Sequence, residues 1–87
     1  MQRMKMERIK FLPNHIIEIE LTGSKIIQYD MTSKLKTAKF RGLQEEEYFK
    51  TGKLINNSFI QWNAIIQLYD YEILGKDFIR KNFKVIE

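Results

Sequence analysis

The stretch HIIEIELTGSKIIQYDM, residues 15–31, decides the fold because both of its halves alternate apolar and polar side chains. A period of two is typical of strands that are buried on one face, whereas a helix repeats its apolar positions every three or four residues. Gly23-Ser24 stands between the halves and offers a two-residue connection that would close a β-hairpin. The side chains expected to be buried occupy odd positions: Ile17, Ile19, Leu21, Ile27, Tyr29 and Met31.

The segment that precedes this hairpin has the same period. In MERIKFL, residues 6–12, Ile9 and Phe11 share the odd parity, and Pro13-Asn14 follows as a turn. Proline restricts its own backbone, and asparagine tolerates turn geometry. Residues 6–31 therefore predict three antiparallel strands in a meander.

From Thr32 onward the alternation stops, and the spacing predicts one or two short helices. The first is expected near residues 33–39, with Thr32 or Ser33 as its N-cap, and the second begins near Leu43. Three glutamates fit the first turn of the second helix, where carboxylates complement the helix dipole, and a glycine fits its C′ position: Glu45, Glu46, Glu47 and Gly52. The expected anchors in the core are Phe40, Leu43 and Phe49.

Strand-like alternation returns after Lys53. The run KLI, residues 53–55, is followed by Asn56-Asn57 as a turn and then by a long apolar ribbon, SFIQWNAIIQLYDYEIL, residues 58–74. Every even position from Ile60 to Leu68 is apolar, which predicts a half-buried strand running without a break through WNAIIQL, residues 62–68. Trp62 is expected in the core, since large aromatic side chains dominate core burial. Three apolar residues on the opposite face are candidates for binding a partner: Phe59, Ile65 and Tyr69.

These segments predict a small single α+β domain in the order β-β-β-α-β-β, followed by a C-terminal element. The chain has 87 residues, too few for a second core. We expect residues 1–75 to form the α+β domain and residues 76–87 to form an appendage that packs on the same domain. Two alternatives remain for the appendage: a terminal helix from Gly75 to Phe83, or a last strand at FKVIE, residues 83–87, which would pair with a sheet edge.

The order of motifs resembles the bacterial domain-of-unknown-function family 2442 over roughly residues 8–74. The resemblance rests on FLP at residues 11–13, YDM at 29–31, FRGLQEEEYF at 40–49 and FIQW at 59–62. The positions that match the family pattern are Tyr29, Asp30, Met31, Phe40, Leu43, Phe49, Ile60, Trp62 and Leu68. The chain departs from that pattern where the family has Pro, Gly and Asp, since it has Asn63, Ile65 and Gln67 there.

The resemblance implies a small α+β module without an established activity. Some members of the family stand beside toxin-antitoxin-like genes, and others are fused to helix-turn-helix domains. An antitoxin-like or regulatory role in a bacterium is therefore an expectation that comes from the resemblance alone. The matching positions are mostly core positions, so they bear on the fold more than on chemistry.

The residue inventory argues against catalysis. The chain has no cysteine and a single histidine, His15, so no thiolate site and no histidine-rich metal site can form. An enzyme would need converging carboxylates, for which the candidates are Asp30, Asp70 and Glu72. Nothing in their spacing favours such a pocket. We therefore predict a protein that is not an enzyme and that uses no cofactor and no metal.

Charge supplies the remaining functional signal. Fifteen Lys and Arg against eleven Asp and Glu give a net charge of +4, and residues 33–41 carry four of these cations without an acid: Lys34, Lys36, Lys39 and Arg41. Such a patch favours phosphate backbones, so nucleic-acid binding is one alternative. A solvated helix face is the other, and the preferred hypothesis is a module that binds another protein or a second copy of itself. Because no apolar run is long enough to cross a bilayer, the expected location is the cytoplasm.

Overall fold

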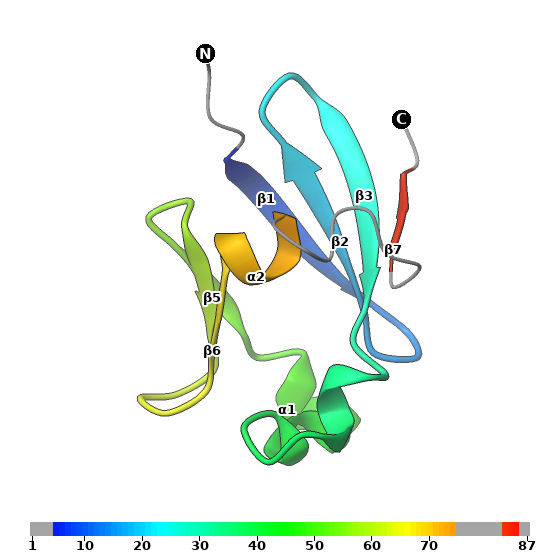
Figure 1. Cartoon of the computed structure of the whole chain (residues 1–87), viewed down its shortest axis with the longest axis vertical. Helices are drawn as coiled ribbons and strands as arrows, with labels where there is room; N and C mark the ends of the chain where they lie inside the picture. The colour runs from blue at the N-terminus through cyan, green and yellow to red at the C-terminus, as the bar shows by residue number, and fades with distance from the viewer. Residues whose placement is uncertain (1–4, 75–82, 86–87) are drawn as a thin grey trace.

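The computed structural model describes residues 5–74 and 83–85, which form two antiparallel sheets joined by short helical turns (Figure 1). The first sheet has the order β1-β2-β3-β7, made of β1 (Met6–Leu12), β2 (Ile16–Leu21), β3 (Lys25–Asp30) and β7 (Phe83–Val85). The second has the order β4-β5-β6, made of β4 (Lys53–Ile55), β5 (Phe59–Gln61) and β6 (Gln67–Tyr69). The helical segments are η1 (Lys34–Lys36), η2 (Arg41–Gln44), α1 (Glu46–Phe49) and α2 (Asp70–Leu74). The predicted α+β class is confirmed.

The meander forms as the alternation predicts. All six odd-numbered apolar residues expected in the core between residues 15 and 31 are fully buried. The connection between β2 and β3 differs in detail from the prediction, because Leu21 pairs with Lys25 and the loop therefore holds three residues, Thr22 to Ser24. Gly23 and Ser24 both have positive φ angles, 84° and 64°. Two left-handed residues turn the chain tightly enough to return it in register.

The helical region is shorter than predicted but keeps its anchors. The helix expected near residues 33–39 is a single 3₁₀ turn, η1, whose N-cap Ser33 makes no side-chain capping bond. The second helix is divided into η2 and α1, with Glu46 and Glu47 in the first turn of α1. The three predicted anchors are all buried: Phe40, Leu43 and Phe49.

The strand predicted through residues 62–68 is wrong, because the chain turns there. β5 ends at Gln61 and β6 begins at Gln67, and the two strands pair antiparallel, with Ile60 opposite Leu68. The alternation survives on both arms, so Ile60 and Leu68 are still buried on the inner face. Ala64, predicted to be buried, is exposed in the turn. A tight hairpin can carry two short alternating runs that read in the sequence as one long run.

The two sheets meet where β1 lies beside β4. The side-chain amide of Asn57 donates a hydrogen bond of 2.8 Å to the backbone oxygen of Met6, which links the β4–β5 turn to the first sheet. Asn56 and Asn57 have φ angles of 51° and 55°, which confirms the turn predicted from this pair. Among the described residues, sixteen apolar side chains from both sheets and from the helical turns form one core.

Residues 83–85 of the C-terminal element form a strand, β7. Residues 83–85 pair antiparallel with β3, so that Ile27 lies opposite Val85 and Tyr29 opposite Phe83. This was one of the two alternatives for residues 76–87. The helix considered from Gly75 falls on residues 75–82, which lie outside the described residues.

Candidate protein-binding surface

Three aromatic side chains stack in a row on the outer face of the second sheet and on the start of α2. Phe59 and Tyr69 lie opposite each other on β5 and β6, with ring centroids 4.8 Å apart. Tyr71 continues the stack at 5.5 Å from Tyr69, and its side chain is 66% exposed. The rings are nearly parallel, with interplanar angles of 28° and 20°. We call Phe59, Tyr69 and Tyr71 the aromatic row.

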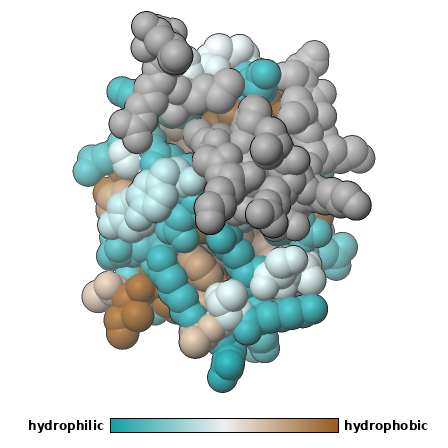
Figure 2. All heavy atoms as spheres, viewed as in Figure 1, coloured by the Kyte–Doolittle hydropathy of each residue, from teal (hydrophilic) through white to brown (hydrophobic). Residues whose placement is uncertain are grey.

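The turn between β5 and β6 presents an exposed isoleucine. Asn63, Ala64 and Ile65 form the tip of this hairpin, all three are exposed, and Ile65 is the most exposed large apolar side chain of the described residues at 81%. The space-filling view shows an apolar patch at the lower left, where the ribbon places the turn after β5 (Figure 2). We call Asn63, Ala64 and Ile65 the hairpin tip.

The hairpin tip is held by the side chain of Asn63. Its Oδ1 accepts hydrogen bonds of 2.8 Å from the backbone N–H groups of Ile65 and Ile66, as in an Asx turn. Its Nδ2 donates to the hydroxyl oxygen of Tyr48 at 2.7 Å, and that hydroxyl donates to the Trp62 carbonyl at 3.2 Å. Ile65 therefore projects from a backbone that is already ordered.

Beneath the hairpin tip lies the indole of Trp62. Its Nε1–H donates to the carbonyl oxygen of Phe49 at 2.7 Å, and its ring stacks on that of Phe49 at 6.1 Å. The prediction that Trp62 belongs to the core is confirmed, with 8% of its surface exposed. Trp62 thereby joins the hairpin to α1, which carries Tyr48.

The structure brings together two of the three residues predicted to bind a partner and separates the third. Phe59 and Tyr69 stack, whereas Ile65 stands at the other end of the hairpin, beyond Gln61. At about 3.3 Å per residue along a strand, four residues separate Phe59 from the hairpin tip by about 13 Å. The residue that sequence reasoning missed is Tyr71. Tyr71 follows Tyr69 by two residues, and this spacing is the signal in the sequence that could have indicated it. The rings of Tyr69 and Tyr71 come into contact only because α2 begins at Asp70, between them.

The predicted basic patch is partly engaged within the fold. Lys34 and Lys39 lie over the ring of Phe40, at 5.8 and 5.0 Å from its centroid. Lys39 also lies 3.5 Å from the carboxylate of Glu72 on α2. Lys36 and Arg41 are exposed, and neither has an ion-pair partner among the described residues.

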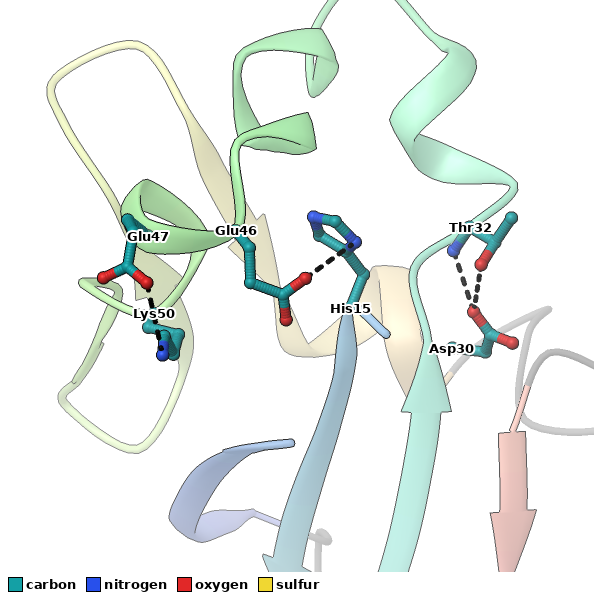
Figure 3. Close-up of polar contacts among 6 residues, drawn as sticks. All are labelled: His15, Asp30, Thr32, Glu46, Glu47 and Lys50. Carbon is teal, nitrogen blue, oxygen red and sulfur yellow. Dashed lines mark hydrogen bonds and ion pairs between the residues drawn. The ribbon is translucent and has the colours of Figure 1, made fainter. Parts of the chain in front are cut away.

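The two glutamates in the first turn of α1, Glu46 and Glu47, do not converge on one site. Glu46 points towards His15, with 3.8 Å between Oε1 and Nδ1, while Glu47 lies 3.6 Å from Lys50 on another side of α1 (Figure 3). Asp30 accepts hydrogen bonds from the backbone N–H and the hydroxyl of Thr32, at 2.9 and 2.6 Å. Within residues 5–74 and 83–85, no group of three or more His, Cys, Asp or Glu side chains is placed to hold a metal ion.

The other carboxylates considered for catalysis have structural positions. An oxygen of Glu72 accepts a 3.0 Å hydrogen bond from the backbone N–H of Tyr69, which secures the passage from β6 into α2. Asp70 is 7% exposed at the start of the same helix. An open hollow of about 300 Å³ on the first sheet is lined by residues of both charges, and Arg8 and Glu20 pair across it at 3.2 Å.

Comparison with family models, curated proteins and solved structures finds no match for this chain. The resemblance to the domain-of-unknown-function family 2442 therefore stays a prediction. Among the described residues, no helix has both the length and the apolar character that crossing a bilayer requires. The arguments about function rest on the geometry of the second sheet.

Proposed function

We propose that this protein is a non-enzymatic interaction module that binds another protein chain through the hairpin tip and the aromatic row. The observation that carries the proposal is the exposure of Ile65, 81%, on a turn whose backbone is fixed by the side chain of Asn63. An exposed isoleucine is in itself ordinary for a globular protein. An ordered backbone beneath it reduces the entropy lost on binding, which is what a contact residue requires.

Ile65 is expected to contribute appreciably to the free energy of binding. Full burial of an isoleucine side chain in a partner would contribute about 1.5–3 kcal/mol to binding. Tyr69 and Tyr71 add aromatic surface with hydroxyl groups, the residue type enriched at protein interfaces. A single interface residue of this kind changes an affinity by about tenfold or more.

Nucleic-acid binding is the competing function, favoured by the exposed side chains of Lys36 and Arg41. The aromatic row argues against it. Proteins that bind single strands stack bases on free ring faces, but Tyr69 has Phe59 on one side and Tyr71 on the other. Tyr69 therefore offers no free ring face on which a base could stack.

A displayed library of random peptides, selected on the full chain, tests the proposal. Peptides enriched on the wild type are then assayed against Ile65→Ser and against the matched control Ile26→Ser, which removes an isoleucine from the outer face of the first sheet. We expect about a tenfold loss of affinity for Ile65→Ser and less than a twofold change for the control. Circular dichroism verifies that both variants are folded.

Two results would contradict the proposal. One is the enrichment of no peptide family, or of families that bind Ile65→Ser as well as the wild type. The other comes from light scattering with a mixed-sequence oligonucleotide: a complex that forms at low salt, dissolves at high salt and is lost in Arg41→Glu would assign the protein to nucleic-acid binding.

A further inference from the structure

We infer that the partner of the hairpin tip is an acidic protein surface with an apolar pocket for Ile65, and that it is not a second copy of this chain. The inference rests on the proposed function and adds the chemistry of the partner. Three observations carry it: the charges of the segment that forms the second sheet, the position of Arg41, and the lining of this chain's own hollow.

The segment that builds the second sheet carries no acid. Between Tyr48 and Tyr69 there is no Asp or Glu, and the two charged residues are Lys50 and Lys53. Lys50 lies 3.6 Å from Glu47, but Lys53 is exposed and has no ion-pair partner among residues 5–74 and 83–85. Lys53 on β4 pairs in register with Gln61, the last residue of β5. The backbone of Lys53 therefore lies beside the strand that leads to the hairpin tip.

Arg41 belongs to η2, which packs next to the hairpin tip. A Cβ added to Gly42 would lie 3.4 Å from Cδ1 of Ile66, so η2 packs directly against the residue that follows Ile65. Arg41 precedes Gly42, is exposed, and has no ion-pair partner among the described residues. Two exposed cations that have no ion-pair partner among the described residues, Arg41 and Lys53, thus belong to the segments that lie next to the hairpin. An apolar centre with a charged rim is the usual arrangement of a protein interface, and this rim is complementary to carboxylates.

A second copy of the chain does not fit this surface. In a symmetric dimer each patch contacts the same patch of its partner, so Arg41 and Lys53 of both copies would be brought together. Like charges across an interface are unfavourable. A head-to-tail contact would need an apolar pocket for Ile65, and the hollow on the first sheet, one that the described residues form, does not match this need because it is lined by Arg8, Lys10, Glu18 and Glu20 as well as by isoleucine. The chemistry therefore favours a different, acidic protein.

Two synthetic peptides test the inference with the full chain. One has a central Trp-Leu pair flanked by glutamates, and the other has lysine at every glutamate position. Fluorescence anisotropy at moderate salt is expected to give a dissociation constant about tenfold lower for the acidic peptide. Ile65→Ser should weaken this binding about fivefold and Arg41→Glu about tenfold, while the charge-matched control Lys5→Glu should change it less than twofold.

The possible results separate this inference from the proposed function. The inference would be overturned if Arg41→Glu and Lys5→Glu weakened binding of the acidic peptide equally, or if Ile65→Ser did not weaken it. Either result would show that the peptide is attracted by the net charge of the chain alone. Library peptides that require Ile65 but are neutral or basic would overturn it and leave the interaction module intact. Anionic phospholipid vesicles are the second probe: binding that depends on both Ile65 and Arg41 would replace the acidic protein with a membrane surface. A salt-resistant dimer lost in Ile65→Ser would equally overturn the inference.

Discussion

At the scale of single residues, Gly52 and Trp62 depend on each other. Gly52 was expected at the C′ position of the second helix, but α1 ends at Phe49 with Lys50 as its C-cap, and Gly52 is not among the residues with positive φ. Its importance comes from the side chains packed against it. A Cβ built on Gly52 would lie 2.7 Å from Cε2 and Nε1 of Trp62 and 3.0 Å from Cζ of Phe11. The indole cannot retreat freely, because it is buried and donates its hydrogen bond to Phe49.

We therefore expect Gly52→Ala to lower the free energy of unfolding by about 1–3 kcal/mol, the usual cost of overpacking. Urea denaturation followed by the fluorescence of Trp62 measures it. Gly42→Ala is the matched control, because its Cβ would meet Ile66 at 3.4 Å, close to ordinary contact. We expect a change within about 1 kcal/mol there, since alanine also reduces the entropy of the unfolded chain. Equal losses in the two variants would contradict the role of the indole.

At the scale of elements, the β5–β6 hairpin depends on Asn63 for its turn. The turn has no glycine, and the backbone N–H groups of Ile65 and Ile66 donate to the side chain of Asn63, which also reaches Tyr48 on α1. The turn is closed by a 3.0 Å hydrogen bond from the N–H of Trp62 to the oxygen of Ile66. One side chain thus sets the turn and attaches it to a helix.

Asn63→Ala is expected to lower the free energy of unfolding by about 1 kcal/mol, because the Oδ1 acceptor and the Nδ2 donor are both lost. Hydrogen exchange should also accelerate at the amides of Ile65 and Ile66, because these two N–H groups donate to Oδ1 of Asn63 in the wild type. Asn63→Asp keeps the acceptor and loses only the donor to Tyr48, so protection of these two amides should be largely retained. If the amides of Ile65 and Ile66 exchanged as slowly in Asn63→Ala as in the wild type, the turn would be shown to form without the side chain of Asn63.

At the scale of the whole molecule, the two sheets behave as one unit because they share a core and a side-chain link. Asn57 and Met6 are 51 residues apart in the sequence, yet they are joined by a 2.8 Å hydrogen bond. Because β1 and β4 belong to different sheets, this hydrogen bond joins the two sheets directly. The first sheet thereby limits how far the β4–β5 turn can move.

Asn57→Gly keeps the positive φ angle of the turn and removes only the link, so we expect the free energy of unfolding to fall by about 1–2 kcal/mol. Its matched control is Asn56→Gly, at a φ angle of 51° in the same turn, which should change stability by less than about 0.5 kcal/mol. Trp62 fluorescence and far-ultraviolet circular dichroism should report one shared transition in both variants. Separate transitions would mean that the sheets unfold independently.

The alternation of side chains over residues 15–31 determined by itself the β2–β3 hairpin and its buried face, because a strand's two faces are fixed by a period of two along the chain. In β1 the register shifts between Met6 and Arg8, so the even-numbered Met6 is fully buried while Ile9 and Phe11 are half-buried. Asn56-Asn57 likewise determined its own turn, since asparagine adopts positive φ angles readily. The core positions of Phe40, Leu43, Phe49 and Trp62 followed from the same local reasoning.

Only the tertiary structure decided where the apolar ribbon of residues 58–74 turns. A hairpin and a continuous strand share the same alternation, and the hydrogen bond between Asn63 and Tyr48 that favours the hairpin joins separate elements. The aromatic row depends on the register of Phe59 with Tyr69, and the surroundings of Ile65 depend on the packing of η2 against Ile66. Local sequence specifies the face of a strand, but contacts between distant segments decide which exposed side chains become neighbours.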